Sequence, residues 1–372
     1  MKILTILSGL DSGGVENILL NYYRCMNRDL IKIDIIVHSK QEGMLEKEFR
    51  QLGCKIYHVC PKKEGILKNY RQIRKILKEN KYDIVHTRMN YRGFTQIIAA
   101  FVSGVKIRIV HNHQAGQDEN CKKIKKIFIF LLKKLTCCFS THWMACSEVA
   151  AIEMFGKKNF EKGKVLILRN AIDLDKYRFN QNIRDEYRKK FKITDKYVIG
   201  VVARFHEQKN YDFIIEIFKK VLKQKKDSIL LLVGTGELYT DIKNKVDLFN
   251  INDNVIFTGA RKDVAYLMQA MDIFILPSKY EGFGNVFIEA QATGLHTLAS
   301  AEGVPKTTKL TNLIEYISLY DIDAWVNKIL EYTNDYVRIP DNSKIAKAGY
   351  GVYEQANILQ DFYIKCFNRS KN

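Results

Sequence analysis

Short apolar runs alternate with longer amphipathic stretches along most of the chain. This alternation is typical of strands and helices that follow one another in a parallel sheet. In the first half, the runs that predict strands lie at residues 3–7, 33–38, 56–59, 84–87, 108–113 and 142–147. In the second half they lie at residues 197–204, 229–234, 255–259, 273–277 and 296–300. We therefore predict an α/β protein with two doubly wound, Rossmann-like parallel sheets.

The chain length and one polar segment predict two domains. The chain has 372 residues, too many for one ordinary core. The charged segment at 169–191 separates the two series of strands and is typical of a hinge. We expect an N-terminal domain over 1–178, a C-terminal domain over 179–345, and a last helix at about 346–372 that packs back on the first domain. Such sheets bind ligands at the carboxyl ends of their strands, so two facing domains predict a ligand cleft.

The amino-acid composition indicates the kind of binding partner and the cellular compartment. Lys and Arg number 60 against 41 Asp and Glu, so the net charge of +19 favours a polyanionic partner. Eight cysteines without the spacing of a zinc site or a disulfide framework are interpreted as buried hydrophobes in a reducing compartment, which predicts a cytoplasmic protein. No apolar run reaches membrane-spanning length. The charge is spread and no nucleic-acid motif occurs, so we do not expect a nucleic-acid partner, although a basic nucleic-acid-binding protein is one alternative.

One basic segment indicates a membrane surface. The sequence CKKIKKIFIFLLKKLTCCF at 121–139 places lysines around a short apolar run. Such a helix can lie among lipid headgroups, although a domain helix with solvated lysines gives the same pattern. We favour an anionic membrane, because it also accounts for the surplus charge, and expect a peripheral protein on the inner face of the cell membrane.

Two segments have features of a phosphate site. In SGLDSGGVENILL at 8–20 a predicted strand runs into a turn in which Gly13 and Gly14 admit a phosphate to a helix start, or simply form a tight turn. Arg204 and Lys209 follow a predicted strand of the second half, where two cations suit a diphosphate. The alternative for the second pair is ordinary surface charge on a solvated loop.

The segment at 272–295 is the most specific. A buried strand ends near Pro277, a glycine-rich loop carries Glu281, and a helix from about Asn285 carries Glu289 before Gly294 ends it. A carboxylate accepts two hydrogen bonds from vicinal hydroxyls, so the two acids suit the donor sugar and the ribose of a sugar nucleotide. The alternative, a helix-start charge and a solvated acid, fits poorly with such apolar surroundings.

Together these segments resemble a known family. GGVE at 13–16, ARFHEQKN at 203–210, LLLVGTGE at 230–237 and the E-x7-E element from Glu281 to Glu289 are similar to family 4 of the GT-B retaining glycosyltransferases. The matches run in order from residue 1 to about residue 330, and LRNAIDLDKY at 168–177 resembles the family's link between domains. The C-terminal part resembles bacterial transferases that build capsular and exopolysaccharides.

The resemblance implies the roles of individual residues. Glu281 would contact the donor sugar as a catalytic group and Glu289 the ribose, while Arg204 and Lys209 would hold the diphosphate. His113, preferred to His111, would lie beside the donor sugar as a second catalytic residue. The remaining donor-binding positions are Gly13, Gly14, Gly234, Phe283, Gly284, Asn285 and Val286. The chain departs from the family at His296, where proline is usual, which puts acceptor choice in doubt.

The expected activity is a retaining, metal-independent transfer. The substrates would be a nucleotide diphosphate sugar, by default UDP-linked, and a lipid-linked or saccharide acceptor, with no cofactor. No Asp-x-Asp pair follows a strand as in metal-dependent transferases, so cationic side chains and helix ends must neutralise the leaving diphosphate. A non-hydrolysing sugar-nucleotide epimerase is the alternative within enzymes, and would convert the donor without an acceptor.

Overall fold

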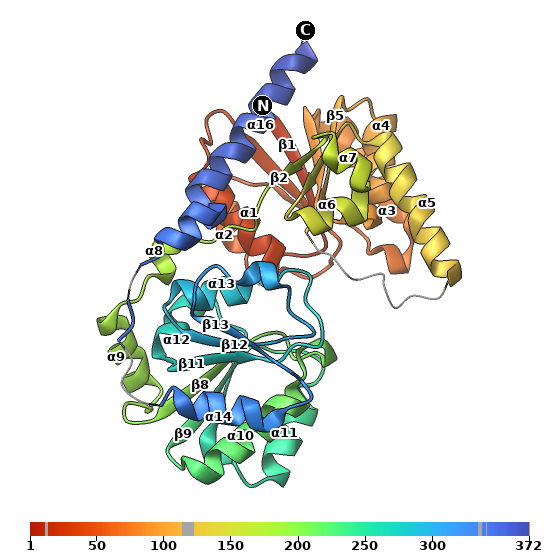
Figure 1. Cartoon of the computed structure of the whole chain (residues 1–372). Helices are drawn as coiled ribbons and strands as arrows, with labels where there is room; N and C mark the ends of the chain where they lie inside the picture. Colours follow the sequence, from red (N-terminus) through yellow and green to blue (C-terminus); the bar gives the residue numbers. More distant parts are fainter. Residues whose placement is uncertain (12–13, 114–122, 334–336, 340, 372) are drawn as a thin grey trace. The chain divides into compact units, whose positions relative to one another are not determined.

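The computed structural model describes residues 1–11, 14–113, 123–333, 337–339 and 341–371. It divides into two compact units, which we call the first unit (Met1–Ile172 with Gly349–Asn372) and the second unit (Asp173–Ala348). The division falls a few residues from the boundaries expected at 178/179 and 345/346. Each unit contains one parallel sheet wrapped by helices (Figure 1).

The sheet of the first unit has seven parallel strands in the order β3-β2-β1-β4-β5-β6-β7. Strand order reverses between the neighbours β1 and β4, the point at which doubly wound folds place ligands. The strands are β1 (Lys2–Leu7), β2 (Lys32–Val37), β3 (Ile56–His58), β4 (Ile84–Thr87), β5 (Ile107–Asn112), β6 (His142–Ala145) and β7 (Val165–Ile167).

Helices cover both faces of this sheet. On one face α1 (Gly14–Cys25) lies beside the C-terminal helix α16 (Val352–Lys371), so the end of the chain belongs to the first unit (Figure 1). The apolar side chains of α3 (Ile66–Asn80) and α4 (Phe94–Val102) cover the other face. The remaining helices are α2 (Glu46–Gln51), α5 (Lys123–Phe139), α6 (Glu148–Phe155) and α7 (Lys157–Glu161).

The sheet of the second unit has six parallel strands in the order β10-β9-β8-β11-β12-β13. They are β8 (Tyr197–Val202), β9 (Ser228–Val233), β10 (Val255–Gly259), β11 (Ile273–Leu276), β12 (His296–Ser300) and β13 (Ile314–Ile317). The helices are α8 (Leu174–Tyr177), α9 (Gln181–Lys190), α10 (Tyr211–Gln224), α11 (Tyr239–Leu248), α12 (Val264–Ala270), α13 (Asn285–Ala292), α14 (Ile322–Glu331) and α15 (Ser343–Ile345). Strands β8, β9 and β11 are almost wholly buried, as their continuous apolar runs require.

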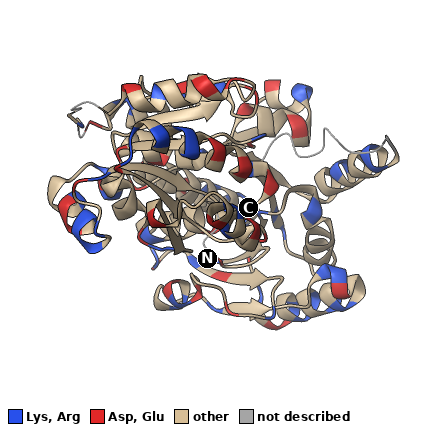
Figure 2. Cartoon of the chain, turned by 90° about the horizontal axis from the view of Figure 1, so that it is seen from below, with Lys and Arg blue, Asp and Glu red and all other residues tan. Residues whose placement is uncertain are grey.

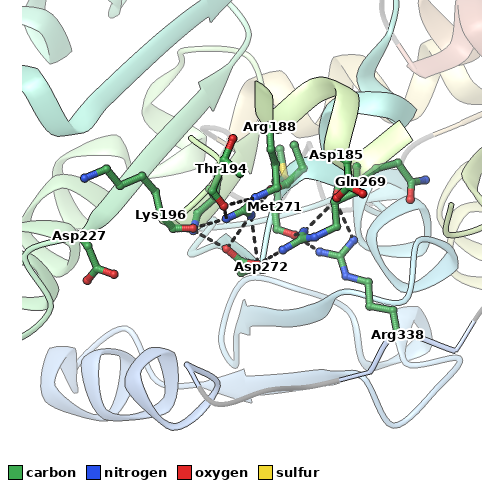
Figure 3. A network of polar contacts seen from close by, with 12 residues as sticks. Asp185, Arg188, Thr194, Lys196, Asp227, Gln269, Met271, Asp272 and Arg338 are labelled. Carbon is green, nitrogen blue, oxygen red and sulfur yellow. Dashed lines mark hydrogen bonds and ion pairs between the residues drawn. The ribbon is translucent and has the colours of Figure 1, made fainter. Parts of the chain in front are cut away.

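The boundary between the two units falls inside the segment 169–191, and helix α9 of this segment is part of the second unit. Arg184 and Arg188 of this helix both pair with Asp272, directly before β11. Figure 3 shows the contact of Arg188 with Asp272. The Arg188 Nη1 to Asp272 Oδ2 distance is 3.1 Å, and the Val198 amide donates to the same carboxylate oxygen at 2.7 Å. The charges of this segment therefore fix a helix to the sheet.

Two corrections concern short strands. The sequence pattern missed β7 and β13, which lie at the edges of their sheets. Each has only three or four residues, and only its first residue is buried, so no clear apolar run marks it. In the described ranges, no helix has both the length and the apolarity needed to cross a bilayer.

Candidate active site

Glu281 and Lys209 form a buried ion pair at the carboxyl edge of the second sheet. The Lys209 Nζ to Glu281 Oε1 distance is 2.6 Å, and the side chains are only 16% and 6% exposed. The Ser278 hydroxyl donates to the same carboxylate oxygen at 2.6 Å. A carboxylate held by an ammonium and a hydroxyl is fixed in position, as a group that orients a polar substrate must be.

The two loops that carry this pair are joined by backbone contacts. The Lys279 amide donates to the Gln208 carbonyl at 2.8 Å, and the Gln208 side-chain amide donates to the Tyr280 carbonyl at 2.7 Å. These contacts follow from sheet order, because β8 and β11 are neighbours and both loops leave the same edge. On the other side, a Cβ at Gly303 would lie 2.0 Å from the Ser278 carbonyl oxygen. The Glu281 loop is therefore enclosed from two directions.

Glu289 lies half-buried on α13, the helix that follows this loop. The Tyr177 hydroxyl donates a hydrogen bond to its carboxylate, and burial raises the pKa of Glu289 to about 7. Gly284 has a φ of 82° and precedes the helix, and a Cβ there would lie 2.7 Å from the Phe287 ring. The turn thus requires glycine and brings the Asn285 and Val286 amides to the helix start.

Two other predicted donor positions have a structural role that is visible directly. Gly234 has a φ of 142°, and a Cβ there would lie 2.0 Å from the Ala203 carbonyl oxygen. The glycine therefore lets the loops after β8 and β9 approach each other. Phe283 as a whole is 5% exposed, so its ring packs inside the unit.

Arg204 does not join the Lys209–Glu281 pair. Its side chain is 66% exposed and lies 3.9 Å from Glu237, measured from Nη2 to Oε1. His206 Nε2 approaches the same Glu237 oxygen at 3.4 Å. The two cations predicted to hold a diphosphate thus have separate acidic partners, and a shared role stays a prediction.

In the first unit, His113 lies directly after β5 and is buried. Its Nδ1 lies 3.2 Å from Asn170 Oδ1, and its Nε2 lies 3.3 Å from Arg88 Nη1. The rings of His111 and His113 stack at 3.8 Å, so both histidines share a face, as alternation along the strand predicts. Burial lowers the pKa of His113 to about 3, which keeps the ring neutral near pH 7. A contact between His113 and a sugar stays a prediction.

The glycine-rich turn is only partly visible. Gly13 lies outside the described residues, whereas Gly14 is the exposed first residue of α1. Glu16 in the first turn of this helix has a pKa raised to about 7, mainly by burial.

Sequence reasoning missed Ser278, Tyr177 and Arg88 as site residues. Arg88 follows directly on β4, and a cation at the carboxyl end of a predicted strand was the signal that identified Arg204. Ser278 and Tyr177 carried no such signal, because their roles come from contacts with Glu281 and Glu289.

Helix α5 carries the predicted membrane segment. Cys121 and Lys122 lie outside the described residues. From Ile124 onward the helix exposes large apolar side chains, among them Ile124, Ile127, Phe128, Phe130, Leu131 and Leu135. Lys125, Lys126 and Lys134 are exposed beside them. Elsewhere Lys and Arg are spread over many helices and often lie near acidic residues (Figure 2).

The described residues contain no cluster of three or more His, Cys, Asp or Glu side chains that suits a metal ion.

Solved structures share the fold over almost the whole chain. HepE from Anabaena, solved in complex with UDP-glucose, matches with a TM-score of 0.78 at 18% identity, covering 98% of this chain and 100% of that one. WaaG, a glycosyltransferase involved in lipopolysaccharide biosynthesis, matches with a TM-score of 0.69 at 17% identity, covering 96% and 95%. The fold is therefore GT-B.

Family comparisons then define the class. Residues 12–176 match Glycosyltransferase Family 4, and residues 183–351 match Glycosyl transferases group 1. The chain belongs to these glycosyltransferases.

Among relatives, it is 28% identical to the putative glycosyltransferase EpsF of Bacillus subtilis, covering 97% of this chain and 96% of that protein. It is also 28% identical to an Escherichia coli UDP-Gal:alpha-D-GlcNAc-diphosphoundecaprenol alpha-1,3-galactosyltransferase, covering 80% and 79%.

Proposed function

We propose that this glycosyltransferase moves a sugar, with retention of configuration and without a metal ion, from a UDP-sugar to a lipid-linked acceptor in bacterial surface polysaccharide synthesis. The observation that carries the proposal is the buried Lys209–Glu281 pair, followed by Glu289 on the next helix. An acid fixed by a lysine at the carboxyl edge of a parallel sheet suits a substrate that carries both hydroxyls and phosphates.

The donor would be held by hydrogen-bond donors at its diphosphate and by a carboxylate acceptor at its ribose. Lys209 is a point charge that can attract a diphosphate oxygen while it still contacts Glu281. The amides of Asn285 and Val286 at the start of α13 can receive the same diphosphate. Glu289 would accept hydrogen bonds from the ribose. Two comparisons support UDP as the nucleotide of the proposed donor: HepE is solved with UDP-glucose, and the Escherichia coli relative is named for a UDP-sugar.

The chemistry follows from this charge distribution. As the bond between sugar and diphosphate breaks, negative charge grows on the diphosphate and positive charge grows on the ring. Lys209 and the start of α13 stabilise the negative charge on the diphosphate. The Glu281 carboxylate stabilises the positive charge on the ring without forming a bond to the sugar. In the proposed step, the departing β-phosphate oxygen accepts the proton of the acceptor hydroxyl, and that hydroxyl oxygen attacks the same face of the sugar.

The test uses donor binding and product stereochemistry together. A thermal-shift panel of nucleotide sugars identifies the donor, since a ligand that binds only the folded protein raises its melting temperature. Transfer with that donor, in the presence of EDTA, is followed by ¹H NMR of the new anomeric proton. We expect transfer to proceed with the donor's α or β configuration preserved. An inverted product, or activity that EDTA abolishes, would contradict the mechanism.

The acceptor proposal rests on α5. Its exposed apolar side chains and neighbouring lysines suit an anionic lipid surface, where apolar burial and charge attraction add. The Escherichia coli relative is named for a diphosphoundecaprenol-linked acceptor.

Liposome flotation at low salt tests this part. We expect binding to vesicles with anionic lipid, and weaker binding to zwitterionic ones. Ile127→Ser with Leu131→Ser should reduce flotation, whereas the control Ile66→Ser with Leu67→Ser, two exposed apolar residues of α3, should not. Equal flotation of both double variants would rule out α5 as the contact.

A further inference from the structure

Arg88 is a buried cation whose guanidinium is only partly hydrogen-bonded. The side chain follows β4 directly, and the residue is 5% exposed. Nη1 donates to His113 Nε2 at 3.3 Å, whereas Nε and Nη2 are buried and have no hydrogen-bond partner among the described residues. No carboxylate of the described residues pairs with it. A buried charge left without a counter-charge is costly, so folded proteins keep one where a ligand uses it.

The groups around Arg88 are polar and uncharged. His111 is fully buried with both ring nitrogens unpartnered, and His86 has Nε2 unpartnered. His86 Nδ1 lies 2.6 Å from the Tyr363 hydroxyl of α16, the same hydroxyl is hydrogen-bonded to the Arg88 guanidinium, and the Tyr22 hydroxyl lies near it. Three neutral imidazoles and two phenols beside one guanidinium form a polar cluster with a single net positive charge.

The contact between Arg88 and His113 also fixes the tautomer of the histidine. Arg88 has only N–H donors, so His113 Nε2 must accept, and the proton therefore lies on Nδ1, which donates to Asn170. In this arrangement both ring nitrogens are engaged inside the first unit. His113 can contact a substrate hydroxyl through Nε2 only after Arg88 has moved to another partner.

We propose that Arg88 binds a phosphate group of a substrate through Nε and Nη2. A guanidinium with free Nε and Nη2 groups presents the two parallel N–H donors that suit a phosphate. The anion supplies the missing counter-charge, while Nη1 keeps its contact with His113 Nε2. The inference depends on the proposed function only for the source of the phosphate, which is either the diphosphate of the acceptor or that of the donor.

Calorimetric titrations distinguish the two sources. Inorganic pyrophosphate is titrated into protein saturated with UDP, and UDP is titrated separately. Each uses wild type, Arg88→Gln, and the control Arg71→Gln, which removes an exposed arginine of α3. If Arg88 binds the acceptor phosphate, pyrophosphate should still bind to the UDP-saturated wild type. Its affinity should be at least tenfold lower in Arg88→Gln and unchanged in Arg71→Gln. If Arg88 binds the donor phosphate, the affinity for UDP should be at least tenfold lower in Arg88→Gln. Unchanged affinity in both titrations would overturn the proposal.

Two further readouts exclude a purely structural role. Without ligand, Arg88→Gln should melt at or above the wild-type temperature, because it removes an uncompensated buried charge. In long-range ¹H–¹⁵N spectra of the wild type, the bound anion should shift the His113 Nε2 resonance. A lower melting temperature with unaltered binding would instead assign Arg88 to the core and refute the inference. If UDP binding is then still weakened by substitution of Lys209, the proposed function remains supported although the inference about Arg88 fails.

Discussion

Lys209 and Glu281 are separated by 72 positions in the chain and meet at 2.6 Å, between Nζ and Oε1. The meeting follows from the pairing of β8 with β11, which puts the loops after these strands side by side. The acid and the lysine therefore hold each other in position before any substrate arrives.

Glu281→Gln should separate catalysis from nucleotide binding. The amide keeps the shape of the side chain but cannot stabilise positive charge on the sugar ring, so we expect turnover to fall by about 100- to 1000-fold. Affinity for UDP, which has no donor sugar, should change by less than about threefold. The control Glu237→Gln removes an exposed acid that contacts Arg204. Full turnover in Glu281→Gln would exclude Glu281 from the reaction.

Glu289→Gln should stabilise the protein at alkaline pH while weakening UDP binding. Burial raises the pKa of Glu289 from 4.5 to about 7, so the folded state keeps its proton where the unfolded chain has lost it. The resulting loss of stability begins as pH rises above 4.5 and is complete above 7. We expect Glu289→Gln to raise the free energy of unfolding by about 1–3 kcal/mol at pH 8, and by much less at pH 5.

The control for this experiment is Glu216→Gln, which removes a surface acid of α10 that pairs with Lys245. It should change the unfolding free energy by less than about 0.5 kcal/mol, equally at both pH values. A pH-independent effect of Glu289→Gln would show that its carboxyl titrates normally.

Asp272→Asn should destabilise the second unit. The carboxylate pairs with both Arg184 and Arg188 and accepts from the Val198 amide (Figure 3). Without its charge, the buried guanidinium of Arg188 and the half-buried one of Arg184 lose their counter-ion, at a cost of about 2–4 kcal/mol. Asp227→Asn, a half-exposed acid paired with Lys225, should cost less than about 0.5 kcal/mol in the same urea titration. Equal midpoints for the two variants would contradict the role given to α9.

Gly234→Ala should disturb the loops that carry the candidate site. The added Cβ would lie 2.0 Å from the Ala203 carbonyl oxygen, so the backbone must shift. We expect a loss of about 2–3 kcal/mol in stability and at least tenfold in UDP affinity. Gly259→Ala is the matched control, since Gly259 also has a positive φ but has nothing within 4 Å of the added atom. It should lose about 1 kcal/mol and keep its UDP affinity. Similar UDP affinity in the two variants would contradict the prediction.

The sequence predicted the sheets and the acidic loop, because their signals are local. An apolar strand, a glycine-rich loop and a helix with an acid in its second turn follow one another within 272–295, and the structure has β11, the loop and α13 there. The ion pair with Lys209 was not predictable, since it depends on which strands are neighbours. The charged segment at 169–191 contains the boundary between the units, but the attachment of its helix α9 to the sheet was not predictable, because the partner of its arginines, Asp272, is distant in sequence.

In the first unit too, local features were predictable from the sequence and contacts between elements were not. Alternation along β5 correctly put His111 and His113 on one face. The contact of His113 with Arg88 involves a neighbouring strand, and Tyr363 enters the same cluster from the last helix. Contacts of this kind are decided by packing and leave no periodic signal.

Calorimetric titration of UDP into wild type, Lys209→Gln and Lys220→Gln tests whether the buried pair belongs to a nucleotide site. Lys220 is a surface lysine of α10 that pairs with Asp323, so the control removes an equal charge. We predict that Lys209→Gln binds UDP about 10- to 100-fold more weakly, as expected for one lost charge-assisted contact to a phosphate, and that Lys220→Gln binds like wild type. Wild-type affinity in Lys209→Gln would contradict the assignment of this edge of the sheet to the donor.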